Sequence, residues 1–346
     1  MSVLVKMIKT VQAYAPCFKQ SEQIIFKLTR IGQAMSGRNR RFSSFTPLAL
    51  LALAGLVLTL VPLRVQAADT RASIEVNGHK RNLRLVETAR LKKTPRTTII
   101  VFHAGRGSVT RLQRSLGLDE LARKSGAVLV YPGAINGRWD VGKASGPATD
   151  DAQFVKAIIT KLVADGVSDR RKIYVAGVSS GGMLAMRLAC ESTDLFAGAA
   201  ALIANLPADL AANCNPTKPL PFLLINGTAD PLVPFNGGKS TLPDYADNVV
   251  STQASLEPFI KAAKCSEQIT RQDLPDRDPN DGSRVILEKY AACSAPIELL
   301  RIEGGGHTIP GRRTPSSRGA AVGAQNNDID SARAIFDFFK RAGSAR

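Results

Sequence analysis

Histidine and tryptophan are scarce in this sequence, which has three His and one Trp among 346 residues. It also lacks low-complexity runs, internal repeats and the paired Cys and His spacing that zinc sites require. With 44% hydrophobic residues, its composition is that of a folded protein with a sizeable core. A disordered chain, a repeat protein and a zinc module are thereby excluded. A reaction that needs an imidazole has only three candidates.

Clustered basic charge is missing from most of the chain, although the formal net charge is +17. Residues 1–67 contain nine of the 46 Lys and Arg but one acidic residue, so the remainder carries 37 basic and 28 acidic side chains. That remainder has no block of Lys and Arg interleaved with aromatic residues. We therefore expect a solvated basic surface and no nucleic-acid partner.

Residues 1–67 have the pattern of an export signal. A basic cluster at 38–41 precedes an apolar run of 15 residues at 47–61, which is short for a membrane span of about 20 residues. Val65 and Ala67 are placed for signal-peptidase cleavage. We expect a secreted or periplasmic protein with no membrane association after cleavage. An uncleaved membrane anchor is the alternative.

Met35 lies just upstream of the basic cluster and is a candidate start of the signal. Residues 1–34 are then an over-extended start, an unusually long leader or a disordered tail. The pair Arg40 and Arg41 resembles a twin-arginine signal, but the residues after it do not complete that pattern.

Five cysteines occur, and without Cys17 in the leader they form an even set of four. Four cysteines allow three pairings, and proximity along the chain favours Cys190 with Cys214 and Cys265 with Cys293. Because export leads to an oxidising compartment, disulfides are expected rather than four buried thiols.

Residues 68–346 show the alternation of a single α/β domain with a mostly parallel central sheet and helices on both faces. A hairpin around Asn77-Gly78 opens the domain. Apolar, β-branched runs then alternate with helical patterns. The strands are expected at 97–104, 127–133, 172–178, 197–204, 221–227 and 297–304, and two of the helices at 150–166 and 331–343. Residues 265–293 are polar and turn-rich and are expected to form an excursion beside the site, with one short strand at "RVILEKY".

Ser179 stands in "KIYVAGVSSGG", directly after an expected strand and before a helical pattern. In open α/β sheets reactive groups gather at the carboxyl ends of the strands, and a sharp turn there exposes a serine hydroxyl. Such a turn needs neighbours without side chains, which Gly177 and Gly181 supply, while Gly182 lets the helix pack closely. These glycines predict that Ser179 is a nucleophile.

A serine nucleophile needs a base and an orienting acid, which in this fold follow in the order Ser, Asp, His. His307 in "IEGGGHTIPG" is the only histidine after Ser179. Asp230 follows a buried strand in "LLINGTADPLVPF", and Asp244 and Asp247 are weaker candidates. The alternatives are a surface histidine and a plain turn aspartate.

The oxyanion of an acyl-transfer reaction needs two positioned donors. The backbone N–H of Ser180 is one candidate, since it lies at a helix N-terminus. Gly105, in the loop after the strand at 97–104, is the other, and His103 is then expected to hydrogen-bond within that loop. Neither "NGGKST" nor "GVSSGG" has the glycine spacing of a nucleotide site, so no cofactor or metal is expected.

With these features the sequence resembles the secreted polyhydroxybutyrate-depolymerase-like esterases, which are related to feruloyl and acetylxylan esterases. The resemblance implies an α/β-hydrolase fold and ester hydrolysis through an acyl-enzyme, with Ser179 as nucleophile, Asp230 as acid and His307 as base. It rests on the ordered motifs "VFHAGRGS", "VYPGAINGRWD", "DDAQFVKAII", "DRRKIYVAGVSSGGMLA", "NGTADPLVPFNGG", "LPDRDPNDGSRV" and "IEGGGHTIPG".

Two departures from that family pattern concern the site. Ala104 replaces the usual glycine after the loop histidine, which affects the shape of the oxyanion loop. Ile309 replaces an aromatic residue, so a preference for polymers or aryl esters is not inherited. Trp139 is a candidate for lining the substrate pocket together with Ile309, and structural packing is its alternative.

The sequence thus predicts a serine esterase that hydrolyses polyhydroxybutyrate-type, feruloyl, acetyl or short-chain esters, either small molecules or polymers. A peptidase or thioesterase with the same triad is one alternative. A non-catalytic glycan-binding or adhesion protein on a hydrolase scaffold is the other.

Overall fold

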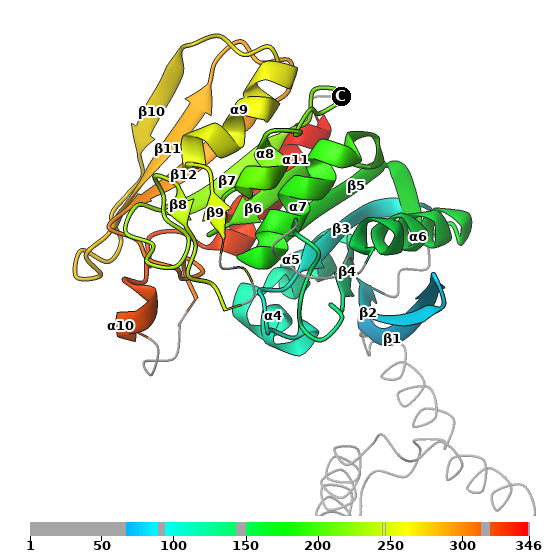
Figure 1. Ribbon diagram of the computed structural model, residues 1–346. Coiled ribbons are helices and arrows are strands. Elements are labelled where there is room, and N and C mark those ends of the chain that lie inside the picture. The colour runs from blue at the N-terminus through cyan, green and yellow to red at the C-terminus, as the bar shows by residue number, and fades with distance from the viewer. Residues whose placement is uncertain are drawn as a thin grey trace, which may run out of the picture. The chain divides into compact units, whose positions relative to one another are not determined.

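A mixed ten-stranded sheet is the centre of the computed structural model, which describes residues 67–88, 94–142, 150–243, 245, 247–312 and 319–344 (Figure 1). Nearly all of the expected leader, including Cys17 and Met35, lies outside these residues. The strand order is β1-β2-β4-β3-β5-β6-β7-β12-β11-β10. These strands are β1 (Ala67–Val76), β2 (His79–Thr88), β3 (Arg96–Phe102), β4 (Val128–Pro132), β5 (Ser168–Val178), β6 (Gly198–Leu202), β7 (Phe222–Gly227), β10 (Ile269–Asp273), β11 (Arg284–Tyr290) and β12 (Ile297–Glu303).

The six strands from β4 to β12 in the sheet order are parallel, whereas both edges are antiparallel. Parallel strands need helical crossovers, which is why both faces of this sheet are covered. The described helices are α4 (Val109–Leu116), α5 (Leu118–Ser125), α6 (Asp151–Ala164), α7 (Ser180–Glu191), α8 (Ala208–Ala211), α9 (Thr252–Ala262), α10 (Gly319–Val322) and α11 (Ser331–Ser344).

Two hydrophobic clusters lie on opposite faces of the sheet. Along β3, Ile100 and Phe102 pack into one cluster and Ile99 and Val101 into the other, because successive side chains of a strand point to opposite faces. Helices α6, α7 and α9 contribute to the first cluster, and α4, α5 and α11 to the second (Figure 1). The predicted mostly parallel sheet with helices on both faces is confirmed.

The two edges of the sheet differ in how well the sequence predicts them. The hairpin turn is confirmed: Asn77 and Gly78 have φ of 51° and 75° between the paired residues Val76 and His79. The prediction of one short strand in residues 265–293 is wrong, because both β10 and β11 lie in this segment and extend the sheet. The exposed β10 carries one apolar residue in five, so its sequence lacks the alternation that marks a strand.

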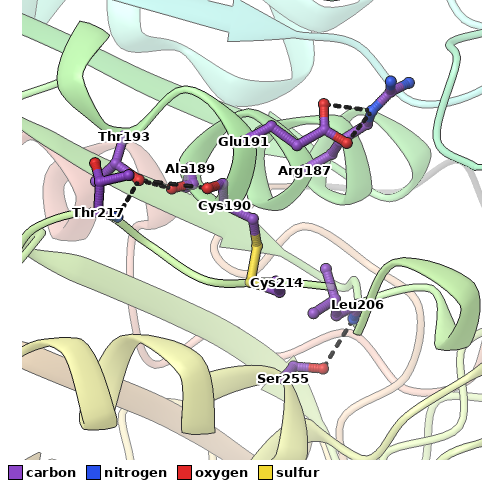
Figure 2. Close-up of a disulfide and its surroundings, with 9 residues drawn as sticks. All are labelled: Arg187, Ala189, Cys190, Glu191, Thr193, Leu206, Cys214, Thr217 and Ser255. Atoms are coloured by element: carbon purple, nitrogen blue, oxygen red, sulfur yellow. Dashed lines mark hydrogen bonds and ion pairs between the residues drawn. A yellow bond between two sulfur atoms is a disulfide. The ribbon is translucent and has the colours of Figure 1, made fainter. Parts of the chain in front are cut away.

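Two disulfides join Cys190 to Cys214 and Cys265 to Cys293, which confirms the pairings favoured by proximity. The first links the last turn of α7 to the segment after α8 (Figure 2). The second closes the base of the segment that contains β10 and β11. Within the described part of the chain, no helix has the length and apolar character needed to cross a membrane.

A buried ion pair attaches the N-terminal hairpin to the domain. Arg81 on β2 lies 2.5 Å from Asp151 on α6, with 3% and 0% of their side chains exposed. The guanidinium also lies over the ring of Phe154, 4.2 Å from its centroid. Such a pair adds little net stability, but leaving one partner buried alone is costly.

We therefore expect Arg81→Ala to lower the free energy of unfolding by about 3 to 5 kcal/mol, because Asp151 stays buried without its cation. Urea unfolding followed by circular dichroism measures this loss. The double variant Arg81→Met/Asp151→Leu should lose less than the single variant. Equal or greater loss in the double variant would contradict this account of the ion pair.

Candidate active site

Ser179 occupies a strained turn between β5 and α7. Its φ of 57° and ψ of −127° lie in a region that L-residues rarely adopt, at a cost of about 1 to 3 kcal/mol. Two backbone hydrogen bonds hold the turn. The N–H of Ser179 donates to the carbonyl of Leu202 at 2.9 Å, and its own carbonyl accepts from the N–H of Met183 at 3.0 Å.

The glycines around Ser179 allow close backbone approach. A Cβ on Gly177 would lie 2.0 Å from the carbonyl oxygen of Gly181. A Cβ on Gly181 would lie 2.4 Å from that of His103, and one on Gly182 would lie 2.7 Å from the Cβ of Ala204. The turn therefore requires all three glycines for steric reasons.

His307 follows β12 and the three glycines 304–306. Gly304 has a φ of 72°, and a Cβ on Gly306 would lie 2.2 Å from the carbonyl oxygen of Val322. The N–H of His307 donates to the same carbonyl. This loop brings Nε2 of His307 to 2.9 Å from Oγ of Ser179, although the two residues are 128 positions apart.

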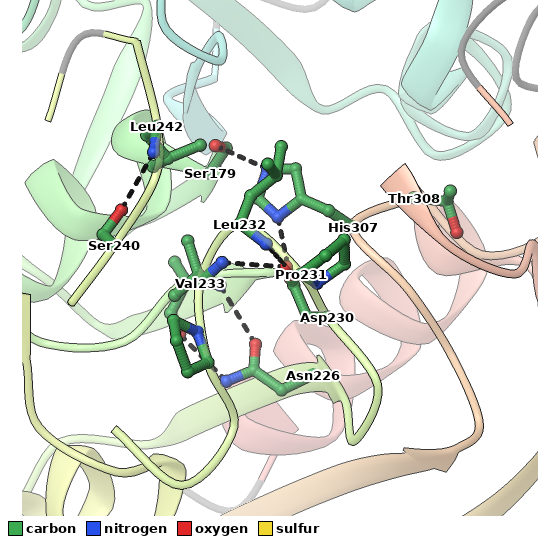
Figure 3. Close-up of polar contacts among 12 residues, drawn as sticks. Ser179, Asn226, Asp230, Pro231, Leu232, Val233, Ser240, Leu242, His307 and Thr308 are labelled. Atoms are coloured by element: carbon green, nitrogen blue, oxygen red, sulfur yellow. Dashed lines mark hydrogen bonds and ion pairs between the residues drawn. The ribbon is translucent and has the colours of Figure 1, made fainter. Parts of the chain in front are cut away.

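Asp230 lies in the loop after β7, and its Oδ2 is 2.7 Å from Nδ1 of His307. Its other oxygen, Oδ1, accepts hydrogen bonds at 2.8 Å from the N–H groups of Leu232 and Val233. Figure 3 shows the imidazole between Ser179 and Asp230. A carboxylate at Nδ1 keeps the proton on that nitrogen, so Nε2 is left as an acceptor facing the hydroxyl.

The loops that carry Asp230 and His307 are hydrogen-bonded to each other. The N–H of Ala229 donates to the carbonyl of Gly305 at 3.0 Å, and the N–H of Gly304 donates to Oγ1 of Thr228 at 2.9 Å. The His307 and Asp230 side chains are 8% and 2% exposed. Mutual bonding and burial fix the imidazole and the carboxylate as one unit.

The two residues expected to bind an oxyanion lie in different elements, a helix and a turn. Ser180 is the first residue of α7. Gly105 lies in a turn in which the N–H of Gly107 donates to the carbonyl of Ala104 at 2.9 Å. His103 makes the contact expected within this loop, since its Nδ1 donates to the carbonyl of Ala104 at 2.8 Å. The roles of Ser180 and Gly105 as donors remain predictions.

Trp139 and Ile309, the two candidates for lining a substrate pocket, are both at least partly buried. Trp139 is 2% exposed, and its Nε1 donates to the carbonyl of His103 at 2.8 Å. It therefore supports the loop of Gly105 from within the core, which is the packing role given as its alternative. Ile309 is partly buried against the second hydrophobic cluster. A role for either residue in lining a substrate pocket stays a prediction.

The remaining candidates from the sequence lie elsewhere. The carboxylate of Asp247 accepts from the N–H of Asn248 at 2.7 Å, and Asp244 lies outside the described residues. His79 is the first residue of β2, in the hairpin. Among the described residues, His, Cys, Asp and Glu side chains form no group of three or more that could hold a metal ion.

This fold, with a strained serine turn at the carboxyl end of a central parallel strand and an Asp–His pair against it, defines the α/β-hydrolase class. A family model described as Phospholipase/Carboxylesterase matches residues 145–267. The putative esterase NocK of Nocardia uniformis subsp. tsuyamanensis is 32% identical over 291 residues, which are 79% of this chain and 83% of that protein.

Feruloyl esterase B of Piromyces equi is 26% identical over 218 residues, which are 60% of this chain and 39% of that protein. Among solved structures, an acetyl xylan esterase from Aspergillus awamori aligns with a TM-score of 0.51 at 14% identity, covering 78% of this chain and 99% of that one. The chain belongs to the esterase family of the α/β-hydrolase superfamily and is a carboxylic-ester hydrolase.

Gly181→Ala should disrupt the serine turn, because the new Cβ would overlap the carbonyl oxygens of His103 and Phe102. We expect kcat/KM for p-nitrophenyl butyrate to fall at least about a hundredfold, as a shift of about 1 Å in the reacting atoms costs this much. Gly319→Ala is the matched control, since a Cβ there has nothing within 4 Å. Equal activity of the two variants would show that the turn tolerates a side chain.

Proposed function

We propose that Ser179, His307 and Asp230 form the catalytic triad of a serine esterase. The single observation that carries this proposal is the continuous chain of hydrogen bonds from Oγ of Ser179 through His307 to Oδ2 of Asp230. These residues come from three separate loops at the carboxyl ends of β5, β7 and β12. An activated serine hydroxyl needs this pairing with a base and an orienting acid.

In the first half-reaction, Oγ of Ser179 attacks the ester carbonyl carbon and its proton passes to Nε2 of His307. The carboxylate of Asp230 stabilises the imidazolium, and the N–H groups of Ser180 and Gly105 donate to the oxyanion. Cleavage of the ester C–O bond releases the alcohol, which takes the proton from His307. Water then attacks the acyl-enzyme with the same base, and Ser179 regains its proton when the acid leaves.

The substrate class we propose is an ester of an aromatic or short-chain carboxylic acid. Feruloyl esterase B of Piromyces equi supports the aromatic acid by its name, over the 60% of this chain that it matches. Ile309, where the resembling esterases carry an aromatic residue, favours soluble esters over a solid polyhydroxybutyrate surface and gives the aromatic acid no support, so that part of the proposal rests on the relative alone. We further propose a secreted or periplasmic location, which the two disulfides support.

Ser179→Ala should leave the fold intact and lower ester turnover at least about a thousandfold, because only binding and oxyanion stabilisation remain. Turnover of p-nitrophenyl butyrate, methyl ferulate, acetylated xylan and hydroxybutyrate oligomers measures this, with circular dichroism as the test of folding. Ser125→Ala, at an exposed serine, is the control and should keep full activity.

A fluorophosphonate probe should label wild-type protein and Ser125→Ala but not Ser179→Ala. An anilide and a thioester assayed beside the esters distinguish an esterase from a peptidase or thioesterase. Folded wild-type protein that neither reacts with the probe nor turns over any of these substrates would overturn the proposed function in favour of a binding protein.

Asp230→Asn tests the acid separately. The amide oxygen can keep the hydrogen bonds from Leu232 and Val233, so the loop is retained while an NH₂ group faces His307. The imidazole then adopts the wrong tautomer, and we expect kcat to fall about 10⁴-fold. Asp247→Asn is the control. Comparable kcat values for the two variants would remove Asp230 from the triad.

A further inference from the structure

Asn226 is a polar residue in the otherwise apolar strand β7, "FLLING", and is only 4% exposed. A buried amide is costly unless its donors and its acceptor are all paired. Every polar atom of the Asn226 carboxamide has a partner: the amide binds Ala204 and Asn205 in the segment after β6 and Thr252 on α9. Nothing in the triad chemistry itself uses this side chain.

Asn226 holds the segment that follows β6. Its Oδ1 accepts from the N–H of Ala204 and its Nδ2 donates to the carbonyl of the same residue, both at 3.0 Å. The preceding residue, Ile203, has a φ of 45°, which is rare and strained for a β-branched side chain. Such strain persists only where surrounding contacts fix the backbone, and the Asn226 amide supplies two of them.

The segment after β6 also supports the turn that carries Ser179. The carbonyl of Leu202 accepts the hydrogen bond from the N–H of Ser179 at 2.9 Å. The Cβ of Ala204 lies so close to Gly182 that a side chain there would approach it to 2.7 Å. The position of Ala204 thus fixes how α7 and the Ser179 turn sit on the sheet.

The loop that carries Asp230 is reached only indirectly, through Asn205, which follows Ala204 in the same segment. Its Nδ2 donates to Oδ1 of Asn205 at 2.9 Å, and Nδ2 of Asn205 donates to the carbonyl of Pro234 at 2.8 Å. The hydroxyl of Thr252 on α9 completes the network by donating to the same Oδ1 of Asn205. Pro234 ends the segment whose N–H groups bind Asp230. Figure 3 shows Asn226 beneath this loop, on the strand leading into it.

We propose that Asn226 is a positioning residue that holds the Asp230 loop in register with the Ser179 turn. The proposal rests on the proposed triad, because it assigns Asn226 no chemistry of its own. The role requires an acceptor and a pair of N–H donors on one planar group at a buried position. Aspartate lacks the donors, and an aliphatic residue lacks both, so only the amide can bind the N–H and the carbonyl of Ala204 and also Oδ1 of Asn205.

Asn226→Ala tests this directly, with Asn326→Ala as the matched control. Asn326 is also buried, at 1% exposure, and its amide donates to Ser283 and Asp328 instead of to the triad loops. Both variants should lose stability by a similar amount. Only Asn226→Ala should lose kcat for p-nitrophenyl butyrate, by about tenfold to a hundredfold, with KM changed less than about twofold.

Asn205→Ala provides a second variant should Asn226→Ala fail to fold, because it cuts the link to Pro234 and leaves the two bonds to Ala204. We expect it to lower kcat at least about fivefold, and the double variant to lose less than the product of the two single losses, as coupled residues do. The proton NMR signal of the His307 Nδ1–H, which Asp230 holds, should shift in both single variants and stay unchanged in Asn326→Ala.

Wild-type kcat in folded Asn226→Ala and Asn205→Ala, with an unchanged His307 signal, would overturn the positioning role. Equal loss of kcat in Asn326→Ala would also overturn it, since general loosening would then explain the effect. Activity of the wild-type protein and loss in Ser179→Ala are measured in parallel. An inactive wild type would instead reject the triad, so the two failures are distinguishable.

Discussion

At the Ser179 turn, the backbone lies so close to the end of β3 that no side chain fits between them. The positions of the other groups in the site follow from this contact. The turn packs against the last residues of β3, so the carbonyl of His103 lies where Gly181 would otherwise carry a side chain. That contact places the loop of Gly105 beside Ser179. Hydrogen bonds with Leu202 and Met183 hold the strained backbone of Ser179, and the free energy that the strain costs is offset by the packing around it.

Buried polar side chains connect separate elements at two places in the molecule. The pair of Arg81 and Asp151 joins a hairpin to a helix. The amide of Asn226 instead binds the segment after β6 to β7, and that of Asn205 binds the same segment to Pro234 in the loop of Asp230. In both places a hydrogen-bonded group specifies one arrangement among several that apolar packing alone would permit. Hydrophobic burial supplies most of the stability, and these polar contacts hold particular loops and elements against one another.

Some elements were predictable from sequence because a local signal determines them. The strands β3 to β7 are apolar on both faces, and Asn77-Gly78 has the conformation that a two-residue hairpin needs. Strand β10 was not predicted, because its pairing with β11 is made by the backbone and its exposed side chains do not alternate between apolar and polar residues. Trp139 was ambiguous for a related reason, since an aromatic residue after a strand can face either a core or a pocket.

Residue types and their order are enough to show which side chains are available for the chemistry: one histidine after Ser179, aspartates between the two, and glycines where a turn must be tight. Chain order and residue type are sufficient for that, because this chemistry needs those groups in this fold. That Nε2 of His307 lies 2.9 Å from Oγ of Ser179, and that the Asn226 amide on β7 binds both Ala204 and Asn205 after β6, is visible only in the folded chain. These contacts link residues that are distant along the chain, and no local propensity records where a neighbouring strand or loop will lie.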